Sequence, residues 1–465
     1  MTPRLVIAGS ASGVGKTTTV LALAAALRAR GLRVVAFKCG PDYLDPTYHA
    51  RATGGTSHNL DGWMMGRAAV LATFARACRD ADIALVEGVM GLYDGASPDG
   101  EEGSAAEVAK WLGAPVVAVV DAGGMARTLA AVGVGLRAFD PALDLAGLFA
   151  NRLGSRAHLD LLKRACLQHV PVVGGLPRDA ARAFPERHLG LRTADAEVVP
   201  DALVGAWGAT FAEWNDVDAF VALARRAAAP LGPVDAAGAA PDDVVAATPR
   251  CRIGLARDQA FHFYYDDNLA RLRALGAELV PFSPVADAQL PDVDGVYLGG
   301  GYPELHAAAL AANRPMRAAL SALAAAGAPV YGECGGLMYL ADAVRTVDGV
   351  THPMLGLIAG TAVMHDKLQA LGYVEIETQR RTLLGGAGLR MRGHQFRYST
   401  LEGGAGDAYS VRKRRGGVTF AEGYAGAPGR GDQVLGSYVH VHWASNPLVA
   451  EGLVAACARF AEARR

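Results

Sequence analysis

Near its N-terminus the chain reads Arg4-Leu-Val-Ile-Ala-Gly-Ser-Ala-Ser-Gly-Val-Gly-Lys-Thr-Thr18. The apolar start of this stretch predicts a buried strand, and the glycine-rich part predicts a loop that leads into a helix. In such a loop, backbone N–H groups and the helix N-terminus converge on a phosphate. We therefore expect an ATP site, in which Lys16 reaches the β- and γ-phosphates and Thr17 holds Mg²⁺. The residues expected to bind ATP are Gly13, Gly15, Lys16, Thr17 and Thr18.

The spacing of this loop differs from the usual phosphate-loop pattern. Its first glycine is Gly9, one position early, and Ser10 stands where the pattern has glycine. The order of strand, loop and helix still favours a phosphate site. The chain has Ala11 where partition-type ATPases carry a second lysine, so the loop favours a synthetase over an ATPase of that class.

Short β-branched runs alternate with Ala- and Leu-rich helical patterns through the first half of the chain. This alternation predicts an α/β fold with a mostly parallel sheet and helices on both faces. Ligands of such sheets bind beyond the carboxyl ends of the strands. The expected strands are Leu5–Ala8, Val34–Phe37, Ile83–Glu87, Pro115–Asp121 and Leu145–Asn151.

Three acidic residues, Asp42, Glu87 and Asp94, lie at or just after expected strand ends. Carboxylates in this position suit Mg²⁺ binding and acyl-phosphate chemistry. An aspartate alone in a loop rich in glycine and proline is more commonly a turn former. Because three acids follow strands of one sheet, we expect Thr17, Asp42 and Glu87 to form the metal site.

The length of 465 residues predicts two or three domains. Residues 226–250 are rich in Ala, Gly and Pro without a sustained period, which indicates a linker between domains at 1–225 and 251–465. The second domain also has an α/β pattern, followed by a β-rich stretch over 355–440. Its expected strands and final helix are Arg252–Ala256, Gly295–Gly299, Val330–Glu333 and Pro447–Arg464.

Composition excludes several classes of protein. A formal net charge of −1 argues against a nucleic-acid binder, which usually carries a basic patch. The six cysteines form no CxxC pair, which argues against zinc fingers and redox motifs. The longest apolar stretch, Thr19 to Leu27, is far short of the ~20 residues that span a bilayer. We expect a soluble cytoplasmic protein with neither nucleic-acid nor membrane partners.

A second reaction centre is indicated by Pro329-Val-Tyr-Gly-Glu-Cys-Gly-Gly-Leu-Met338. The pattern predicts a strand, a sharp elbow and a helix, with Cys334 presented at the helix N-terminus, where the dipole favours a thiolate. A cysteine nucleophile needs a histidine base. His440 and His442 both end a predicted strand, and alternation places them on one face, so periodicity does not choose between them.

An oxyanion hole is expected near the cysteine. The segment Leu298-Gly-Gly-Gly-Tyr-Pro-Glu304 follows a predicted strand and offers backbone N–H groups without side chains. Such donors stabilise a tetrahedral intermediate. We expect Gly300 and Gly301 to supply them.

Several long blocks make the chain resemble the cobyrinic acid a,c-diamide synthase family over nearly its whole length. The resemblance implies an N-terminal domain like dethiobiotin synthetase and a C-terminal class I glutamine amidotransferase domain. The blocks run over Phe37–Pro46, Glu87–Asp94, Leu176–Asp179, Pro185–Leu191, Asp258–Tyr265 with Asn268, Gly299–Glu304 and Tyr331–Leu340.

The resemblance also implies the activity and its residues. Such enzymes use ATP, Mg²⁺ and glutamine to amidate the a and c acetate side chains of cobyrinate or hydrogenobyrinate, corrin precursors of vitamin B12. It implies that Cys334 is the glutaminase nucleophile and that His440 is its partner. Ammonia is expected to travel internally, because bulk water would protonate it. Whether the corrin already holds cobalt, and which acetate reacts first, stay open.

A substrate with many carboxylates should meet cationic residues. Aromatic Tyr43 is expected to pack on the macrocycle. The other residues expected in the region of the substrate and the acyl phosphate are Leu44, Asp94, Arg178, Arg182, Arg187 and His188. A homodimer is a further expectation, since symmetric dimers are the commonest soluble homo-oligomers.

The chain departs from the family pattern at one block, where Gly-His-Glu-Phe-His-Tyr-Ser is usual and Gly393-His-Gln-Phe-Arg-Tyr-Ser399 is found. Gln395 and Arg397 therefore replace an acid and a histidine. Two alternatives to corrin amidation remain: amidation of another tetrapyrrole such as nickel-sirohydrochlorin, or a partition-type ATPase switch. The absence of a lysine at position 11 and the cysteine–histidine pair disfavour the switch.

Overall fold

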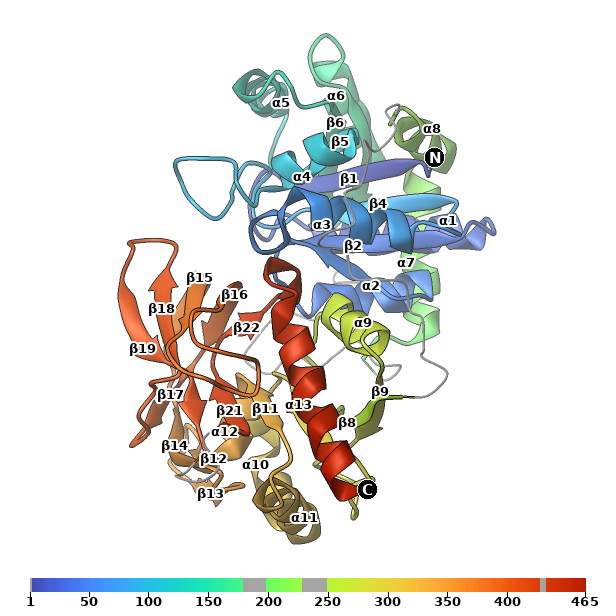
Figure 1. Cartoon of the computed structure of the whole chain (residues 1–465). Helices are drawn as coiled ribbons and strands as arrows, with labels where there is room; N and C mark the ends of the chain where they lie inside the picture. Colours follow the sequence, from blue (N-terminus) through green and yellow to red (C-terminus); the bar gives the residue numbers. More distant parts are fainter. Residues whose placement is uncertain (1, 179–197, 228–248, 427–431) are drawn as a thin grey trace. The chain divides into compact units, whose positions relative to one another are not determined.

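The computed structural model describes residues 2–178, 198–227, 249–426 and 432–465. The chain divides into two compact units, residues 1–239 and 240–465. Figure 1 shows both units. The predicted linker at 226–250 lies mostly outside the described residues, as do Arg182, Arg187 and His188.

The first unit is built on a sheet of seven parallel strands in the order β3-β2-β4-β1-β5-β6-β7. The central strand β1 pairs with β4 and β5, so that Val6 lies beside Val86 and Val116. Parallel pairing brings the carboxyl ends of the strands to one edge of the sheet. The strands are β1 (Arg4–Gly9), β2 (Val34–Cys39), β3 (His58–Leu60), β4 (Ile83–Glu87), β5 (Val116–Asp121), β6 (Leu145–Leu153) and β7 (Val172–Pro177).

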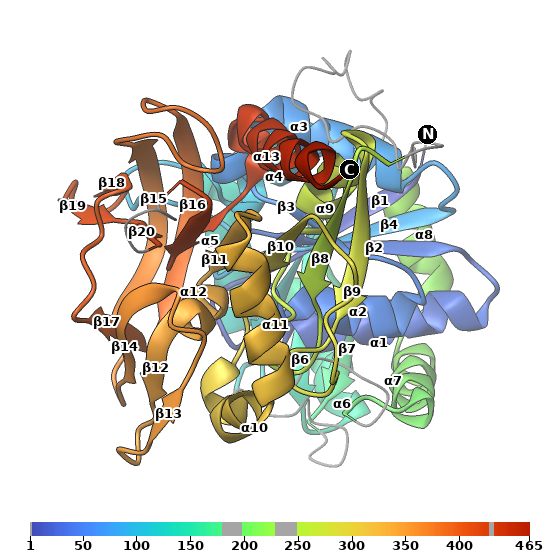
Figure 2. The same ribbon diagram turned by 60° about the horizontal axis from the view of Figure 1, so that its bottom comes forward.

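Helices cover both faces of this sheet, as predicted. Figure 2 shows α3 and α4 on one side and α1 and α7 on the other. A core of buried aliphatic and aromatic side chains joins α1, α7 and α8 to β1, β4 and β5. The helices are α1 (Lys16–Ala29), α2 (Asp45–Thr53), α3 (Gly62–Ala77), α4 (Ala105–Leu112), α5 (Thr128–Phe139), α6 (Arg156–Cys166), α7 (Asp201–Trp214) and α8 (Val217–Arg225).

The second unit contains a six-stranded sheet in the order β20-β21-β11-β10-β8-β9, parallel except for β20. Side chains of β10 alternate between two cores. Tyr297 packs in the core that includes α9 and α13, whereas Val296 and Leu298 pack in the core that includes α10, α11 and α12. The strands are β8 (Cys251–Ala256), β9 (Ala277–Phe282), β10 (Gly295–Leu298), β11 (Val330–Glu333), β20 (Tyr424–Ala425) and β21 (Val434–Ser437). The helices are α9 (Asp266–Ala274), α10 (Ala307–Ala312), α11 (Arg314–Ala325), α12 (Gly335–Leu340) and α13 (Leu448–Arg464).

Two smaller sheets account for the β-rich stretch. One is mixed, with the order β13-β12-β14-β17, and the other is antiparallel, with the order β19-β18-β15-β16-β22. Their strands are β12 (Ala341–Arg345), β13 (Thr351–Pro353), β14 (Ile358–Met364), β15 (Ala370–Thr378), β16 (Arg390–Arg397), β17 (Ser399–Glu402), β18 (Tyr409–Lys413), β19 (Thr419–Glu422) and β22 (His440–Val441).

The predicted strands and the final helix are found. Strands β12 and β13 were not predicted, since they precede the predicted β-rich stretch, and neither were β3, β7 and β9. The last three are edge strands of the parallel sheets. An edge strand has one free side, so it can be short or can carry residues that a central strand excludes. Strand β3 has three residues, β7 contains two glycines, and β9 contains a proline. None of the three gives the continuous apolar run of a buried strand.

Candidate active sites

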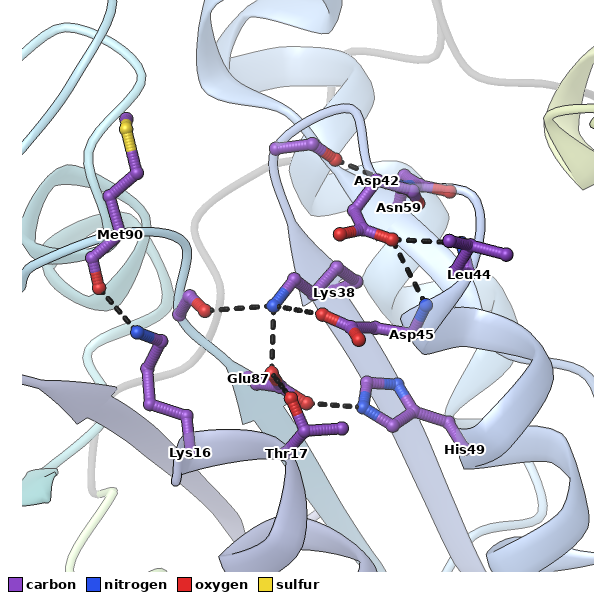
Figure 3. Close-up of polar contacts among 12 residues, drawn as sticks. Lys16, Thr17, Lys38, Asp42, Leu44, Asp45, His49, Asn59, Glu87 and Met90 are labelled. Carbon is purple, nitrogen blue, oxygen red and sulfur yellow. Dashed lines mark hydrogen bonds and ion pairs between the residues drawn. The ribbon is translucent and has the colours of Figure 1, made fainter. Parts of the chain in front are cut away.

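The phosphate loop joins the end of β1 to the start of α1. Gly13 and Gly15 have φ values of +75° and +97°, in the left-handed region that favours glycine. Lys16 begins α1, and its Nζ donates to the carbonyl oxygen of Ala11 at 3.0 Å. It also donates to the carbonyl oxygen of Met90 at 2.5 Å (Figure 3). The ammonium group therefore lies between the loop and the segment that follows β4.

The end of β6 supports the loop from the side. Asn151 Nδ2 donates to the carbonyl oxygen of Val14 at 2.8 Å, and a Cβ on Gly15 would stand 2.0 Å from the same nitrogen. Arg152 donates to the carbonyl oxygen of Gly13 at 2.8 Å. Asn151 and Arg152 were not among the predicted site residues. Their position at the end of a predicted strand of the phosphate-loop sheet was the signal that could have found them.

Thr17 lies at the edge of a buried polar network (Figure 3). Its Oγ1 donates to Glu87 Oε1 at 2.7 Å. Lys38 Nζ on β2 reaches the same Oε1 at 2.7 Å and Asp45 Oδ2 at 2.7 Å, and His49 Nε2 lies 2.6 Å from Glu87 Oε2. The network ties the phosphate loop to β2, β4 and α2.

Charge pairing inside this network outweighs burial. Burial raises the pKa of the Glu87 carboxyl, but Lys38 and His49 lower it by more and hold it well below its usual range. Burial lowers the pKa of the Lys38 ammonium, but Asp45 and Glu87 raise it by more. The ionised forms of Glu87 and Lys38 are therefore favoured, and the anionic Glu87 accepts a hydrogen bond from the Thr17 hydroxyl.

The other predicted acids make local hydrogen bonds. Asp42 Oδ1 accepts from the backbone nitrogens of Leu44 at 2.8 Å and Asp45 at 3.0 Å, where α2 begins. Asp94 Oδ2 accepts from the backbone nitrogen of Gly91 at 2.8 Å. The structure thus brings Thr17 and Glu87 together, while these bonds of Asp42 and Asp94 shape their own loops. The turn-forming alternative describes this part of their geometry.

The Thr17 hydroxyl fits a bound Mg²⁺ ion. Its proton is directed to Glu87, so the oxygen lone pairs remain for a cation. Glu87 itself fits a direct ligand poorly, because its side chain is 0% exposed and both oxygens accept from protein donors. Within the described ranges, no group of three or more His, Cys, Asp or Glu side chains could hold a metal ion. A cation here would therefore need oxygen ligands from a nucleotide.

In the second unit, Cys334 occupies a strained elbow between β11 and α12. Its φ of +49° and ψ of −100° are unusual for a residue with a side chain. The turn is held by a 2.6 Å hydrogen bond from the Cys334 nitrogen to the Ser437 carbonyl oxygen. A Cβ on Gly336 would stand 2.1 Å from the Leu298 carbonyl oxygen, so the elbow needs a glycine there.

The structure places His440, and not His442, beside the cysteine. The Cys334 thiol and the Glu333 carboxyl are the groups that act on the His440 ring. Burial by itself lowers the pKa of the His440 ring, but Cys334 and Glu333 outweigh burial and raise it to about 9. His442 lies after the end of β22, with its ring 4.8 Å from the Tyr265 ring. Alternation fails between the two histidines because the strand ends at Val441 and His442 caps a 3₁₀ turn.

The two glycines of the predicted oxyanion hole have different surroundings. The Gly300 nitrogen donates to the Phe263 carbonyl oxygen at 3.3 Å, so it is already engaged. The Gly301 nitrogen lies 3.1 Å from where a Cβ on Gly335 would stand, next to the nucleophile. This geometry favours Gly301 as the donor and disfavours Gly300.

The comparisons with known proteins agree with this pair of sites. The CobQ/CobB/MinD/ParA nucleotide binding domain family matches residues 5–191, and the CobB/CobQ-like glutamine amidotransferase domain family matches residues 252–448. A cobyrinate a,c-diamide synthase of Leptospira interrogans is 50% identical over 98% of this chain and 99% of its own length. Those of Syntrophotalea carbinolica and Salmonella typhimurium are 46% and 41% identical, and each match covers 98% of both chains. The chain belongs to the cobyrinate a,c-diamide synthase family.

Gln395 and Arg397 are the residues at which the chain departs from the pattern of the cobyrinate a,c-diamide synthase family. Both lie on β16, and the Gln395 side chain is buried. The Arg397 guanidinium lies 4.5 Å over the Tyr438 ring and hydrogen-bonds to the Ser399 carbonyl oxygen. Arg397 therefore packs on Tyr438, which follows Ser437, the residue that anchors the Cys334 elbow.

No helix among the described residues is long and apolar enough to cross a membrane. Of the residues expected near the substrate, Tyr43 and Leu44 follow β2, and Arg178 follows β7. These positions are all at the carboxyl edge of the first sheet.

Proposed function

We propose that the chain is an ATP- and glutamine-dependent ligase that amidates the a and c acetate carboxylates of cobyrinate or hydrogenobyrinate. The observation that carries the proposal is a cysteine on a strained elbow beside a buried histidine, in a chain that also has a phosphate loop. Its assigned domains are an ATP-binding synthetase at 1–225 and a glutamine amidotransferase at 251–465, joined by a linker at 226–250.

The second unit would release ammonia from glutamine. The Cys334 sulfur attacks the side-chain amide carbon, and His440 passes a proton to the departing nitrogen, which leaves as ammonia. A glutamyl thioester remains, and water hydrolyses it to glutamate and the free thiol. The Gly301 N–H is placed to donate to the oxyanion.

The first unit would activate the substrate. A carboxylate is a poor acylating agent in water, so its oxygen takes the γ-phosphoryl group of ATP and leaves ADP. Ammonia then attacks the acyl phosphate, and inorganic phosphate departs as the amide forms. Lys16 and the loop glycines would bind the phosphates, and Thr17 would hold Mg²⁺, which when bound spreads the γ-phosphate charge.

The other assigned residues would shape this site. Asp42 and Asp94 order the loops after β2 and β4, and Tyr43, Leu44 and Arg178 are assigned to the corrin. We propose a cytoplasmic enzyme whose partners are ATP, glutamine and a corrin polycarboxylate, with a homodimer as the expected assembly. The level of identity to cobyrinate a,c-diamide synthases disfavours both a nickel-sirohydrochlorin substrate and a partition switch.

Mass spectrometry tests the proposal directly. Cobyrinate and its metal-free analogue are incubated with the chain, Mg²⁺, ATP and glutamine. Two successive acid-to-amide shifts that need ATP are expected. No shift with either corrin, despite measurable glutaminase activity, would redirect the assignment to another polycarboxylate.

Two variants separate the half-reactions. Cys334→Ser is expected to abolish the use of glutamine and to keep amidation with high ammonium. Lys16→Ala is expected to abolish amidation from either nitrogen source. Glutamine-driven amidation by Cys334→Ser or by Lys16→Ala would contradict the corresponding residue assignment.

A further inference from the structure

A nucleophile–histidine pair normally needs a third group that orients the ring. The residue two positions after His440 is His442. Its ring packs on Tyr265, so it is not the group that orients the His440 ring. The acid nearest to the ring comes from another element. Glu333 Oε2, at the end of β11, lies 3.8 Å from His440 Nδ1.

Glu333 is held in place by donors on three strands. The Tyr297 hydroxyl donates to Oε2 at 3.0 Å, the Tyr331 hydroxyl donates to Oε1 at 2.8 Å, and the Val441 nitrogen lies 3.4 Å from Oε1. The Glu333 residue is 1% exposed. A buried carboxylate with several donors is fixed in direction and acts strongly on a neighbouring charge.

We propose that Glu333 is the positioning residue of the glutaminase, orienting His440 through Nδ1 so that Nε2 is left for the Cys334 thiol. This inference rests on the proposed function. Residues 333 and 334 are adjacent, so one strand end carries both the orienting acid and the nucleophile. The 3.8 Å separation is longer than a hydrogen bond, as catalytic contacts often are before substrate binds.

The charges around this pair support the assignment. Cys334 and Glu333 are the groups that favour the protonated His440 ring. The groups that act electrostatically with Glu333 are His440, Tyr264, Tyr297, Tyr331 and Tyr409. Burial and Glu333 both raise the pKa of Tyr297 and Tyr331, so these hydroxyls stay protonated as donors. Among the groups named here, Glu333 is the carboxyl that lies within 4 Å of His440 Nδ1 and can accept a hydrogen bond from it.

The test is Glu333→Gln in the full chain. Glutaminase kcat is expected to fall by about 10²-fold or more, because a neutral amide neither fixes the ring tautomer nor stabilises the imidazolium. The pH profile of Cys334 alkylation by iodoacetamide is expected to move, with the alkaline limb of glutaminase activity shifted to lower pH. Amidation driven by ammonium is expected to persist, which shows that the first unit is folded.

A second pair of variants keeps the inference open to refutation if Glu333→Gln does not fold. Tyr331→Phe removes one donor to Glu333. Tyr409→Phe removes a buried hydroxyl that has no hydrogen-bond partner among the described residues. We expect glutaminase kcat to fall several-fold in Tyr331→Phe but not in Tyr409→Phe.

The outcomes are distinct. A folded Glu333→Gln with the wild-type kcat and the wild-type alkylation profile would overturn the inference, and so would equal kcat values in the two tyrosine variants. Both readouts use glutamine or iodoacetamide alone. A failure of the proposed corrin activity would appear separately, as wild-type chain that hydrolyses glutamine and leaves the corrin unchanged.

Discussion

The ring of His440 lies directly against the backbone of Gly300, where an added Cβ would stand 2.4 Å from His440 Cε1. Non-bonded carbon atoms rest about 3.5–4.0 Å apart, so any side chain here must displace the ring. The φ angle of Gly300 is outside the left-handed region, so its backbone conformation does not require glycine. Its N–H donates to the Phe263 carbonyl oxygen. Its value to the site is therefore the close approach of the histidine.

Gly300→Ala is expected to lower glutamine-dependent kcat by about 10–100-fold, because a displacement of about 1 Å at a catalytic group has effects of this size. Amidation with high ammonium is expected to stay near the wild-type rate. Gly386→Ala is the matched control, since a Cβ at Gly386 meets nothing within 4 Å. Equal losses in the two variants would refute the steric explanation.

The pH dependence of the glutaminase should report His440. Its pKa is raised to about 9, so the ring is protonated below that pH and can give a proton to the departing ammonia. Activity is therefore expected to fall as pH rises through about 9. Burial lowers the pKa of His442 to about 4, so His442 cannot produce this limb. An alkaline limb near pH 6.5, the ordinary histidine value, would contradict the assignment.

Thr17 offers a test of the ATP half-reaction. Thr17→Ala removes the hydroxyl that bonds to Glu87, and ATP-dependent amidation is expected to fall on the order of 10²-fold, as for the loss of a metal-orienting oxygen. Thr17→Ser keeps the hydroxyl and should retain most of the activity. Glutaminase activity without ATP serves as the internal control. A serine variant as poor as the alanine variant would show that the methyl group, and not the hydroxyl, matters.

The phosphate loop and the cysteine elbow could be predicted from the sequence, because each is formed by a few consecutive residues. The glycine spacing around Lys16 and Cys334 fixes backbone angles within a few residues, so the phosphate loop and the elbow could be recognised. The choice between His440 and His442 could not be made from alternation, because it depends on where β22 ends. The family resemblance made that choice, and the structure places His440 at the cysteine.

The parts that were missed depend on contacts between distant segments. Lys38, His49 and Glu87 come from three different elements, and their sequence neighbourhoods do not reveal that they meet. Glu333 lies in the predicted elbow block, but its approach to His440 depends on the pairing of β11 with β21, which places Glu333 beside Ser437, three residues before His440. Such networks become visible only when the strand order is known.

Lys38 provides the last prediction, on stability. Its side chain is 4% exposed and pairs with Asp45 and Glu87, which are also buried. Lys38→Met removes the ammonium group that Asp45 and Glu87 both contact and is expected to destabilise the first unit by about 3–5 kcal/mol. Lys110→Met is the matched control, because Lys110 is 25% exposed and pairs with Glu101 and Asp140 nearer the surface. Its expected cost is about 1 kcal/mol or less.

Urea denaturation followed by tryptophan fluorescence can measure this loss, because four of the five tryptophans lie in the first unit, at positions 63, 111, 207 and 214. The sign of its pH dependence follows from Glu87. In the wild type, Lys38 lowers the Glu87 pKa, so the pair stabilises the fold above the ordinary pKa of glutamate and loses this contribution as pH falls. The difference between wild type and Lys38→Met should therefore be largest near neutral pH and shrink in acid. A difference that grows in acid, or that equals the Lys110→Met difference, would show that the buried pair does not stabilise the unit in this way.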